Sequence, residues 1–262
     1  MSGEGQPVVW IQTALTADEL MPAAGLVTQN GRYRTVAYHR RGYAGSSPTS
    51  GEGSVTRDAQ DCCVLMNGLG LDEAHIVGVS YSAASAMQVA ADAPGKVASL
   101  CLVEPPPVHV RSAGEFRAVN AEILEQYRTL GAQPTVERFM SRLVGPDWRY
   151  EIEQRLPGGV EQIEADAATF FGTDIPALLS WRFTAADAAR ISAPVLYVGG
   201  SDSGGWFAQV PELMLDWFPG AEHVVIPGAD HSLALTHAHE LSVAMTDFFD
   251  RHPLGMPEDD RG

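Results

Sequence analysis

One serine stands where its hydroxyl could act as a nucleophile. The stretch Gly78-Val79-Ser80-Tyr81-Ser82 nearly matches G-x-S-x-G, the pattern of a nucleophile elbow, in which a strained strand-to-helix turn exposes the serine. Such a turn leaves no room for bulk two residues before or after the serine, so glycine is usual at both positions. Ser82 departs from the pattern, although it is small. The alternative is an ordinary strand-to-helix connection that contains a glycine.

Strand and helix patterns on either side of Ser80 predict how it is held. Ala74 to Val79 is apolar, β-branched and too short for a helix, whereas Tyr81 to Ala91 has small and apolar residues at helical spacing. Upstream, we expect strands at Pro7 to Gln12 and Arg32 to Tyr38 and a helix at Ser54 to Leu69. Thr16 to Glu19 have the form of a capping box, so we expect a further helix to follow them. This alternation predicts a doubly wound, mainly parallel sheet.

The alternation is interrupted after a strand at Val97 to Val103, which three prolines close at 105–107. From about Val108 to Ile191 we expect only amphipathic helices, at 114–130, 135–143, 147–156 and 160–171. Alternation then resumes with strands at 193–198 and 223–226 and helices near 206–217 and at 238–249. The sequence therefore predicts an α/β core formed by residues 1–107 and 192–262, with a helical cap inserted at residues 108–191.

Composition and charge limit the function. The chain has 262 residues, of which 45% are hydrophobic, so it can bury the core of one large α/β domain. Its formal net charge of -16 disfavours nucleic acid, anionic lipid and polyanionic substrates. We therefore expect a neutral small-molecule substrate, with no nucleic-acid or membrane partner.

Cysteine usage and the amino terminus bear on the compartment. Cys62, Cys63 and Cys101 have no C-x-x-C spacing, so we expect buried or inert thiols rather than disulfides or a zinc site. The first residues contain no basic region, and no apolar run reaches membrane-spanning length. These features predict a soluble, cytoplasmic protein.

Several segments together resemble the α/β-hydrolase superfamily, in its branch with a serine nucleophile and a helical cap. They are the strand Pro7 to Gln12, the loop His39 to Ser47 (similar to R-G-x-G-x-S), the elbow at Ser80, the insertion after Glu104, the strand Pro194 to Val198, and Pro227 to His231, which looks like the family's histidine loop. Weak motifs in the right order are stronger together than singly. The family commonly opens with an antiparallel strand pair, which six residues before Pro7 cannot supply, so we expect about six strands.

The resemblance implies that His231 is the base that activates Ser80. A serine hydroxyl is a poor nucleophile at neutral pH and needs a base within hydrogen-bond reach, oriented by a third group. A metal cluster of His231, His237 and His239 with Asp230 is disfavoured, because His-x-His at a helix start points its side chains apart. We expect no metal and no cofactor.

The resemblance also implies an oxyanion hole formed by backbone N–H groups. One would come from Tyr81, after the nucleophile, and the other from Thr13 or Ala14, after the first strand. The family's usual His-Gly is replaced here by Gln12-Thr13, and glycine allows closer backbone approach. The side chains of Gln12 and Thr13 are therefore alternative donors, with Gln12 expected in the substrate pocket.

Two residues compete for the acid that orients His231. The common family position follows the strand Pro194 to Val198 in a G-x-x-D turn, which places the acid on Asp202 or, counted by the usual strand length, on Ser203. Glu104 ends the strand beside the elbow strand, where some capped family members resemble this chain in carrying their acid. A carboxylate at a buried strand end is costly unless it is hydrogen-bonded, which favours Glu104 slightly.

Two functions are consistent with these features. The first is a serine hydrolase that cleaves a neutral, fairly apolar carboxylic ester, lactone or thioester through an acyl-enzyme. A serine rather than an aspartate at position 80 argues against the dehalogenase and epoxide-hydrolase branches. The second is a non-hydrolytic scaffold, such as a cyclase, an isomerase or a ligand-binding or regulatory protein. The altered oxyanion loop keeps this alternative open, because fold does not determine function.

Overall fold

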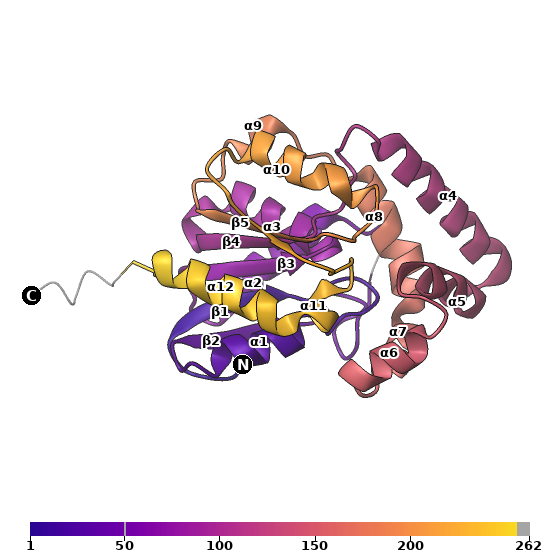
Figure 1. Ribbon diagram of the computed structural model, residues 1–262, viewed down its shortest axis with the longest axis horizontal. Helices are drawn as coiled ribbons and strands as arrows, with labels where there is room; N and C mark the ends of the chain where they lie inside the picture. Colours follow the sequence, from indigo (N-terminus) through magenta and orange to yellow (C-terminus); the bar gives the residue numbers. More distant parts are fainter. Residues whose placement is uncertain (50, 256–262) are drawn as a thin grey trace, which may run out of the picture.

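The protein is built on a six-stranded, fully parallel sheet. The computed structural model describes residues 1–49 and 51–255, in which the strand order is β2-β1-β3-β4-β5-β6 (Figure 1). The strands are β1 Gln6–Ile11, β2 Tyr33–Tyr38, β3 Ala74–Val79, β4 Val97–Val103, β5 Val195–Gly200 and β6 Glu222–Ile226. The prediction of a doubly wound parallel sheet with about six strands is confirmed.

Side chains along each strand alternate between two separate hydrophobic cores, as the two-residue period of a strand requires. On β1, Val9 and Ile11 enter one core, and Val8 and Trp10 enter the other. The first core is covered by α2 Val55–Gly68, α3 Tyr81–Asp92 and α10 Val210–Trp217, and the second by α1 Met21–Thr28, α11 Leu233–Thr236 and α12 Ala238–Arg251. The sheet is therefore buried on both faces, which is typical of parallel sheets with helical crossovers.

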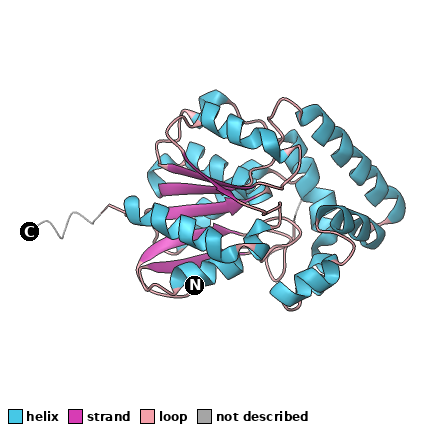
Figure 2. Cartoon of the chain, in the orientation of Figure 1, coloured by secondary structure: helices cyan, strands magenta, loops and turns pink. Residues whose placement is uncertain are grey.

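In the described structure the regular elements between β4 and β5 are all helices. They are α4 Ala113–Leu130, α5 Ala132–Leu143, α6 Trp148–Arg155, α7 Gly159–Thr169, a π-helical turn at Phe170–Asp174, α8 Ile175–Ser180 and α9 Ala185–Ala188. Most of these helices lie beyond the carboxyl ends of the strands (Figure 2). They have their own core, which includes Trp148 and Phe171 and also takes in Leu15 and Leu235 from outside the segment.

The capping box expected at Thr16 to Glu19 is absent, and that prediction was wrong. Helix α1 begins at Met21, and its N-cap residue, Leu20, makes no side-chain capping bond. The Asp18 carboxylate instead accepts hydrogen bonds from Gln12 Nε2 at 3.1 Å and pairs with His39 Nε2 at 2.9 Å. In the expected box the acid would be Glu19 at the third helical position, but α1 begins at Met21, so Glu19 lies before the helix and cannot take that role.

Three short helices and one irregular turn were not anticipated. The helix predicted at 160–171 ends at Thr169 and continues as the π turn, and α8, α9 and α11 are too short to give a periodic apolar pattern. In the described part of the chain no helix is long and apolar enough to cross a membrane.

The cysteines are free thiols, and two of them are buried. Cys62 and Cys101 are buried and Cys63 is half-buried. Burial raises the pKa of the Cys62 thiol to about 12, so this group stays protonated and unreactive at neutral pH.

His75 on β3 makes a specific prediction about stability and pH. Its ring is fully buried, bonds Ser99 Oγ through Nδ1 at 2.8 Å and stacks on Phe249, and burial lowers its pKa from 6.5 to about 4. The unfolded chain protonates His75 below about pH 6.5 but the folded chain does not until about pH 4. The contribution of His75 to the free energy of unfolding is therefore fully present above pH 6.5. It is lost as the pH falls from 6.5 to 4, by roughly 3 kcal/mol in total.

Denaturant unfolding of the wild type and of His75→Asn between pH 7 and pH 5 checks this. Near pH 5.5 the wild-type free energy of unfolding should fall more steeply than that of the variant, by about 1.4 kcal/mol per pH unit. Parallel pH dependences for the two proteins would contradict the assignment.

Candidate active site

Ser80 occupies a strained turn between β3 and α3. Its backbone has φ 51° and ψ -120°, a conformation that costs a non-glycine residue energy and is concentrated at functional sites. A Cβ on Gly78 would lie 2.3 Å from the Ser82 carbonyl oxygen, so only glycine fits there. The Ser80 N–H donates to Val103 O at 2.9 Å, which ties the turn to the end of β4.

Ser82 explains how this turn tolerates the missing second glycine. Its side chain is fully buried, and its Oγ lies 2.9 Å from the Val79 N–H, which donates to it, and 3.0 Å from Val79 O. The hydroxyl is therefore satisfied by the backbone of the residue before Ser80. At position 82, where glycine is usual, the serine side chain thus stabilises the turn by hydrogen bonds to the backbone of Val79.

Ser80, His231 and Glu104 form a continuous hydrogen-bonded row. His231 Nε2 lies 3.1 Å from Ser80 Oγ, and His231 Nδ1 lies 2.9 Å from Glu104 Oε2. The three residues follow β3, β6 and β4, whose carboxyl ends share one edge of the sheet. The imidazole also stacks against Phe207, with ring centroids 4.1 Å apart. This geometry fits a histidine that takes the serine proton and is oriented by a carboxylate.

Glu104 has the hydrogen bonds that a buried carboxylate needs. Only 1% of it is exposed, and its backbone has φ 46°. Its Oε1 accepts from the Gly200 N–H at 2.8 Å and from Ser203 Oγ at 2.9 Å, while Oε2 faces His231. Ser203, one of the two residues that the G-x-x-D pattern allowed at the acid position, thus donates to the glutamate. These partners offset the cost of burying the charge.

Asp202 does not contact His231 in the structure. Its side chain is exposed, and its Oδ1 accepts from Ser201 Oγ at 2.8 Å. It lies at the cavity wall, but the hydrogen-bonded row runs through Glu104 instead. The choice between the two carboxylates therefore favours Glu104 on geometry.

The expected oxyanion residues lie together at the cavity wall. Thr13, Ala14 and Tyr81 line it beside Ser80. The Thr13 side chain donates to Val79 O at 2.9 Å and is therefore committed to the structure, which leaves backbone N–H groups as the donors that fit an oxyanion.

Gln12 does not belong to the cavity, which corrects its expected place in the substrate pocket. Its side chain is 2% exposed, is not among the cavity-lining residues and bonds Asp18. Its carbonyl oxygen accepts from Arg40 Nε at 3.1 Å. The side chain points away from the cavity because its Nε2 group donates to the Asp18 carboxylate on the neighbouring turn.

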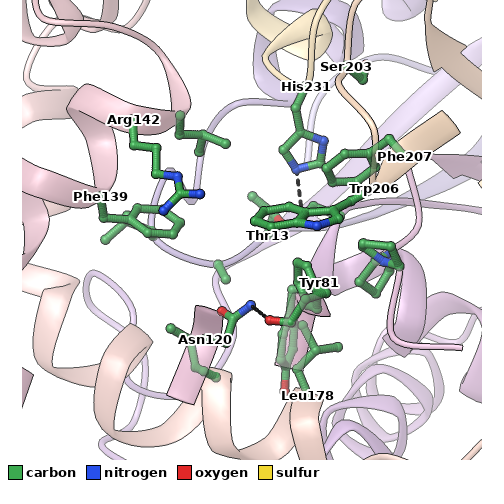
Figure 3. A pocket seen from close by; sticks show the side chains of 18 of the residues that line it. Thr13, Tyr81, Asn120, Phe139, Arg142, Leu178, Ser203, Trp206, Phe207 and His231 are labelled. Carbon is green, nitrogen blue, oxygen red and sulfur yellow. Dashed lines mark hydrogen bonds between the residues drawn. The ribbon is translucent and has the colours of Figure 1, made fainter. Parts of the chain in front are cut away.

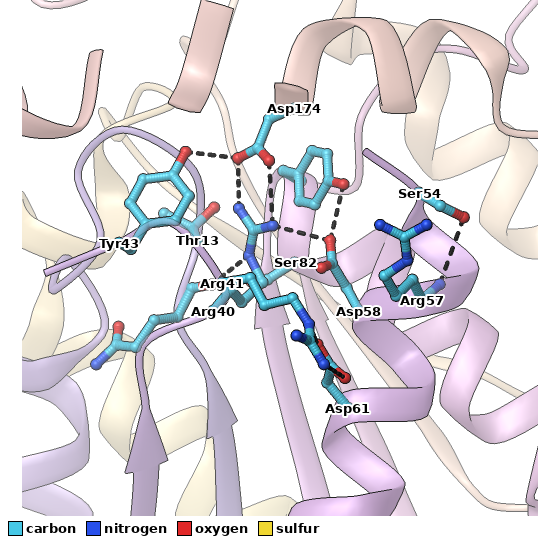
Figure 4. Close-up of polar contacts among 12 residues, drawn as sticks. Thr13, Arg40, Arg41, Tyr43, Ser54, Arg57, Asp58, Asp61, Ser82 and Asp174 are labelled. Atoms are coloured by element: carbon cyan, nitrogen blue, oxygen red, sulfur yellow. Dashed lines mark hydrogen bonds and ion pairs between the residues drawn. The ribbon is translucent and has the colours of Figure 1, made fainter. Parts of the chain in front are cut away.

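Arg40 is the centre of a buried charged cluster that sequence patterns did not reveal (Figure 4). Its side chain is 2% exposed and bonds Asp58 through Nη1 at 2.8 Å and Asp174 through Nη2 at 2.5 Å. Tyr43 donates to Asp174 and Tyr81 donates to Asp58, at 2.5 and 2.9 Å. Because Asp174 lies in the inserted helices, this Arg40 cluster joins the insertion to the loops beside Ser80.

A cavity of about 440 Å³ lies above Ser80, between the sheet and the inserted helices. Its wall is mostly apolar, and Figure 3 shows Phe139 and Arg142 on one side and His231, Trp206 and Phe207 on the other. Phe170, in the π-helical turn of the insertion, also lines it. Sequence reasoning missed Trp206 and Phe207, whose only signal was two adjacent aromatic residues after a Gly-rich turn.

Known proteins resemble this chain over nearly its whole length. A family model described as the alpha/beta hydrolase fold matches residues 10–238. Solved structures with the same arrangement include a carboxylesterase from Nitrososphaera gargenis (18% identity, TM-score 0.80, 95% of this chain and 92% of that chain) and a thermophilic esterase from Thermogutta terrifontis (20%, 0.78, 96% and 92%). An enol-lactonase from Burkholderia xenovorans LB400 is similar at 18% identity and TM-score 0.74, over 95% of this chain and 92% of that chain.

The Arg40 cluster predicts a large difference between two adjacent arginines. Arg40→Met leaves Asp58 and Asp174 without their cation and should cost about 3–5 kcal/mol in the free energy of unfolding. Arg41→Met removes a pair with Asp61 in which the arginine is 42% exposed, and should cost less than about 1 kcal/mol. Denaturant titrations of both variants measure the difference, and equal losses would show that the buried cluster does not stabilise the fold.

Proposed function

The chain belongs to the family with the alpha/beta hydrolase fold, and on this premise we propose that it is a serine hydrolase of a fairly apolar carboxylic ester, lactone or thioester. The observation that carries the proposal is the hydrogen-bonded row from Ser80 Oγ through His231 to Glu104 in the wall of a mostly apolar cavity. This row supplies a nucleophile, a base and an orienting carboxylate in the required order.

In the proposed reaction, Ser80 Oγ attacks the substrate carbonyl carbon while His231 Nε2 takes the hydroxyl proton. The carbonyl oxygen becomes an oxyanion and is bound by the backbone N–H of Tyr81 and of Thr13 or Ala14. Collapse of this intermediate breaks the bond to the leaving alcohol or thiol, which receives the proton from His231. A water molecule, deprotonated by His231, then attacks the acyl-serine. Collapse of this second intermediate breaks the bond between the acyl carbon and Ser80 Oγ, returns the proton from His231 to Ser80 Oγ and releases the acid.

Glu104 has the role of holding the imidazole in one tautomer and stabilising it when protonated. Its Oε2 accepts a hydrogen bond from the Nδ1–H group of His231. The other ring nitrogen, Nε2, is then unprotonated and can receive the serine proton. The Gly200 and Ser203 donors keep the carboxylate in place throughout the cycle.

The substrate class follows from the cavity and the insertion. We assign residues 108–191 as the cap, because its side chains Phe139, Phe170 and Leu178 form apolar wall opposite Ser80. The similar solved structures include proteins named as a carboxylesterase, an esterase and an enol-lactonase, which supports the carbonyl-hydrolase class at the level of the shared fold.

Active-site labelling tests the nucleophile. A fluorophosphonate probe should label the wild type rapidly and stoichiometrically and should not label Ser80→Ala, which retains the fold. Hydrolysis of a short-chain p-nitrophenyl ester should fall in Ser80→Ala by a factor on the order of 10⁶, the loss seen when a protease loses its catalytic serine. Turnover retained within about tenfold would rule out Ser80 as the nucleophile. A wild type that neither reacts with the probe nor hydrolyses the ester would instead favour the non-hydrolytic alternative.

A pair of isosteric changes tests the acid. Glu104→Gln should lower kcat by about 10⁴, because the amide holds the imidazole in the wrong tautomer. Asp202→Asn should lower it by less than about tenfold, because its carboxylate does not reach His231. The reverse order would move the acid to Asp202, and small effects from both would leave a Ser-His dyad. Circular dichroism of each variant confirms that it is folded before the rates are compared.

A further inference from the structure

Glu19 places a carboxyl group in the wall of the cavity that contains Ser80. It lies on the turn between β1 and α1, where its N–H donates to Thr16 O at 3.0 Å. The same turn contributes Thr13, Ala14 and Leu15 to the cavity, so Glu19 belongs to the segment that carries the proposed oxyanion donors. The side chain is partly buried.

The Glu19 carboxyl has no protein partner in the described part of the chain. No hydrogen bond or ion pair involves its side chain there, whereas the neighbouring Asp18 is bonded by Gln12 and His39. Burial raises its pKa from 4.5 to about 8, and no nearby positive charge offsets this rise. The apolar cavity therefore holds one carboxyl group whose ionised form lacks a counter-charge.

Other ionisable groups at the cavity do not supply that counter-charge. Asp174 is already bonded to Arg40 and Tyr43, and Arg142 is exposed and stacks over Trp206 at 5.8 Å. The remaining ionisable groups that line the cavity or flank this turn are Asp18, His39, Tyr81, Asp166, Asp202, Asp230 and His231. Most of them are acidic, and with the net charge of -16 they make the surroundings favourable to a cation.

We propose that Glu19 determines specificity by binding a protonated amino group on the substrate, at a distance from the scissile carbonyl. This rests on the proposed hydrolase function and extends its substrate class to apolar esters, lactones or thioesters that carry one amine. An ammonium group supplies both the charge and the N–H donors that the carboxylate lacks. The expectation of a neutral substrate came from the net charge, which excludes anions but does not exclude cations.

Binding of a non-reactive amine tests the proposal without any hydrolysis. We suggest calorimetric titration of the complete chain, in phosphate buffer free of other amines, with 4-phenylbutylamine and with its neutral counterpart 4-phenyl-1-butanol. At pH 8.5 the amine should bind at least about tenfold more tightly than the alcohol. Between pH 6.5 and pH 8.5 its affinity should rise about 20-fold, because the ionised fraction of a group with pKa 8 rises by that factor while the amine stays protonated.

Two variants give matched controls. Glu19→Gln keeps the shape and hydrogen-bonding capacity but cannot ionise, so both the preference for the amine and its pH dependence should disappear. Asp72→Asn removes an exposed carboxylate that does not line the cavity and should leave both unchanged. Equal binding of amine and alcohol by the wild type, or unaltered amine binding by Glu19→Gln, would overturn the proposal.

Ester hydrolysis separates this proposal from the function on which it rests. Turnover of p-nitrophenyl hexanoate without Glu19-dependent amine binding would leave the hydrolase intact and remove the role of Glu19. Glu19-dependent amine binding without Ser80-dependent turnover of either the hexanoate or its 6-amino derivative would leave the role of Glu19 intact and remove the proposed hydrolase function. If the hydrolase function and the role of Glu19 are both correct, Glu19→Gln should lower kcat/KM at least about tenfold for the 6-amino ester and little for the hexanoate.

Discussion

The backbone turn at Ser80 is the constraint on which the site depends. A non-glycine residue with φ 51° is held there only because its surroundings determine it: β3 leads in, α3 leads out, and Val103 O receives the Ser80 N–H. The close approach at Gly78 and the Ser82 hydroxyl complete the turn. Because the same turn ends a central strand, the residues that follow β1, β4 and β6 meet the hydroxyl without long loops.

Charges buried around this turn are stabilised in two different ways. Glu104 and Arg40 each have three or more polar partners, so their desolvation is offset within the protein. Glu19 has none in the described chain, and burial shifts its pKa instead. This contrast distinguishes groups that build the site from a group that is available to a ligand.

The parts of the site that could be predicted from sequence are those set by local pattern and strand order. The bounds of β3 and β4 agree with the predicted strands, and Ser80, Glu104 and His231 meet because each follows a strand at one edge of the sheet. The pairing of Arg40 with Asp174 spans 134 positions and depends on how the insertion docks, which no periodicity encodes.

Two expectations fail where tertiary contacts decide the structure. The family resemblance placed Gln12 in the substrate pocket, and a local pattern placed a helix cap at Thr16 to Glu19. Both are determined by tertiary contacts around Asp18. The capping-box interpretation also gave Glu19 a local role, so no sequence pattern indicated that it would line the cavity.

The insertion is attached unequally along its two margins. On one margin, Asp174 is locked to buried Arg40, a contact whose disruption costs about 3–5 kcal/mol. On the other, the contacts are made by exposed or half-buried side chains: Arg142 lies over the Trp206 ring, which is worth about 0.5–1 kcal/mol, Phe116 packs against the same ring, and Gln209 bonds Ser112. The boundary of the insertion beside Phe207 and His231 is therefore made of contacts that individually cost less to break than the buried pair at Arg40.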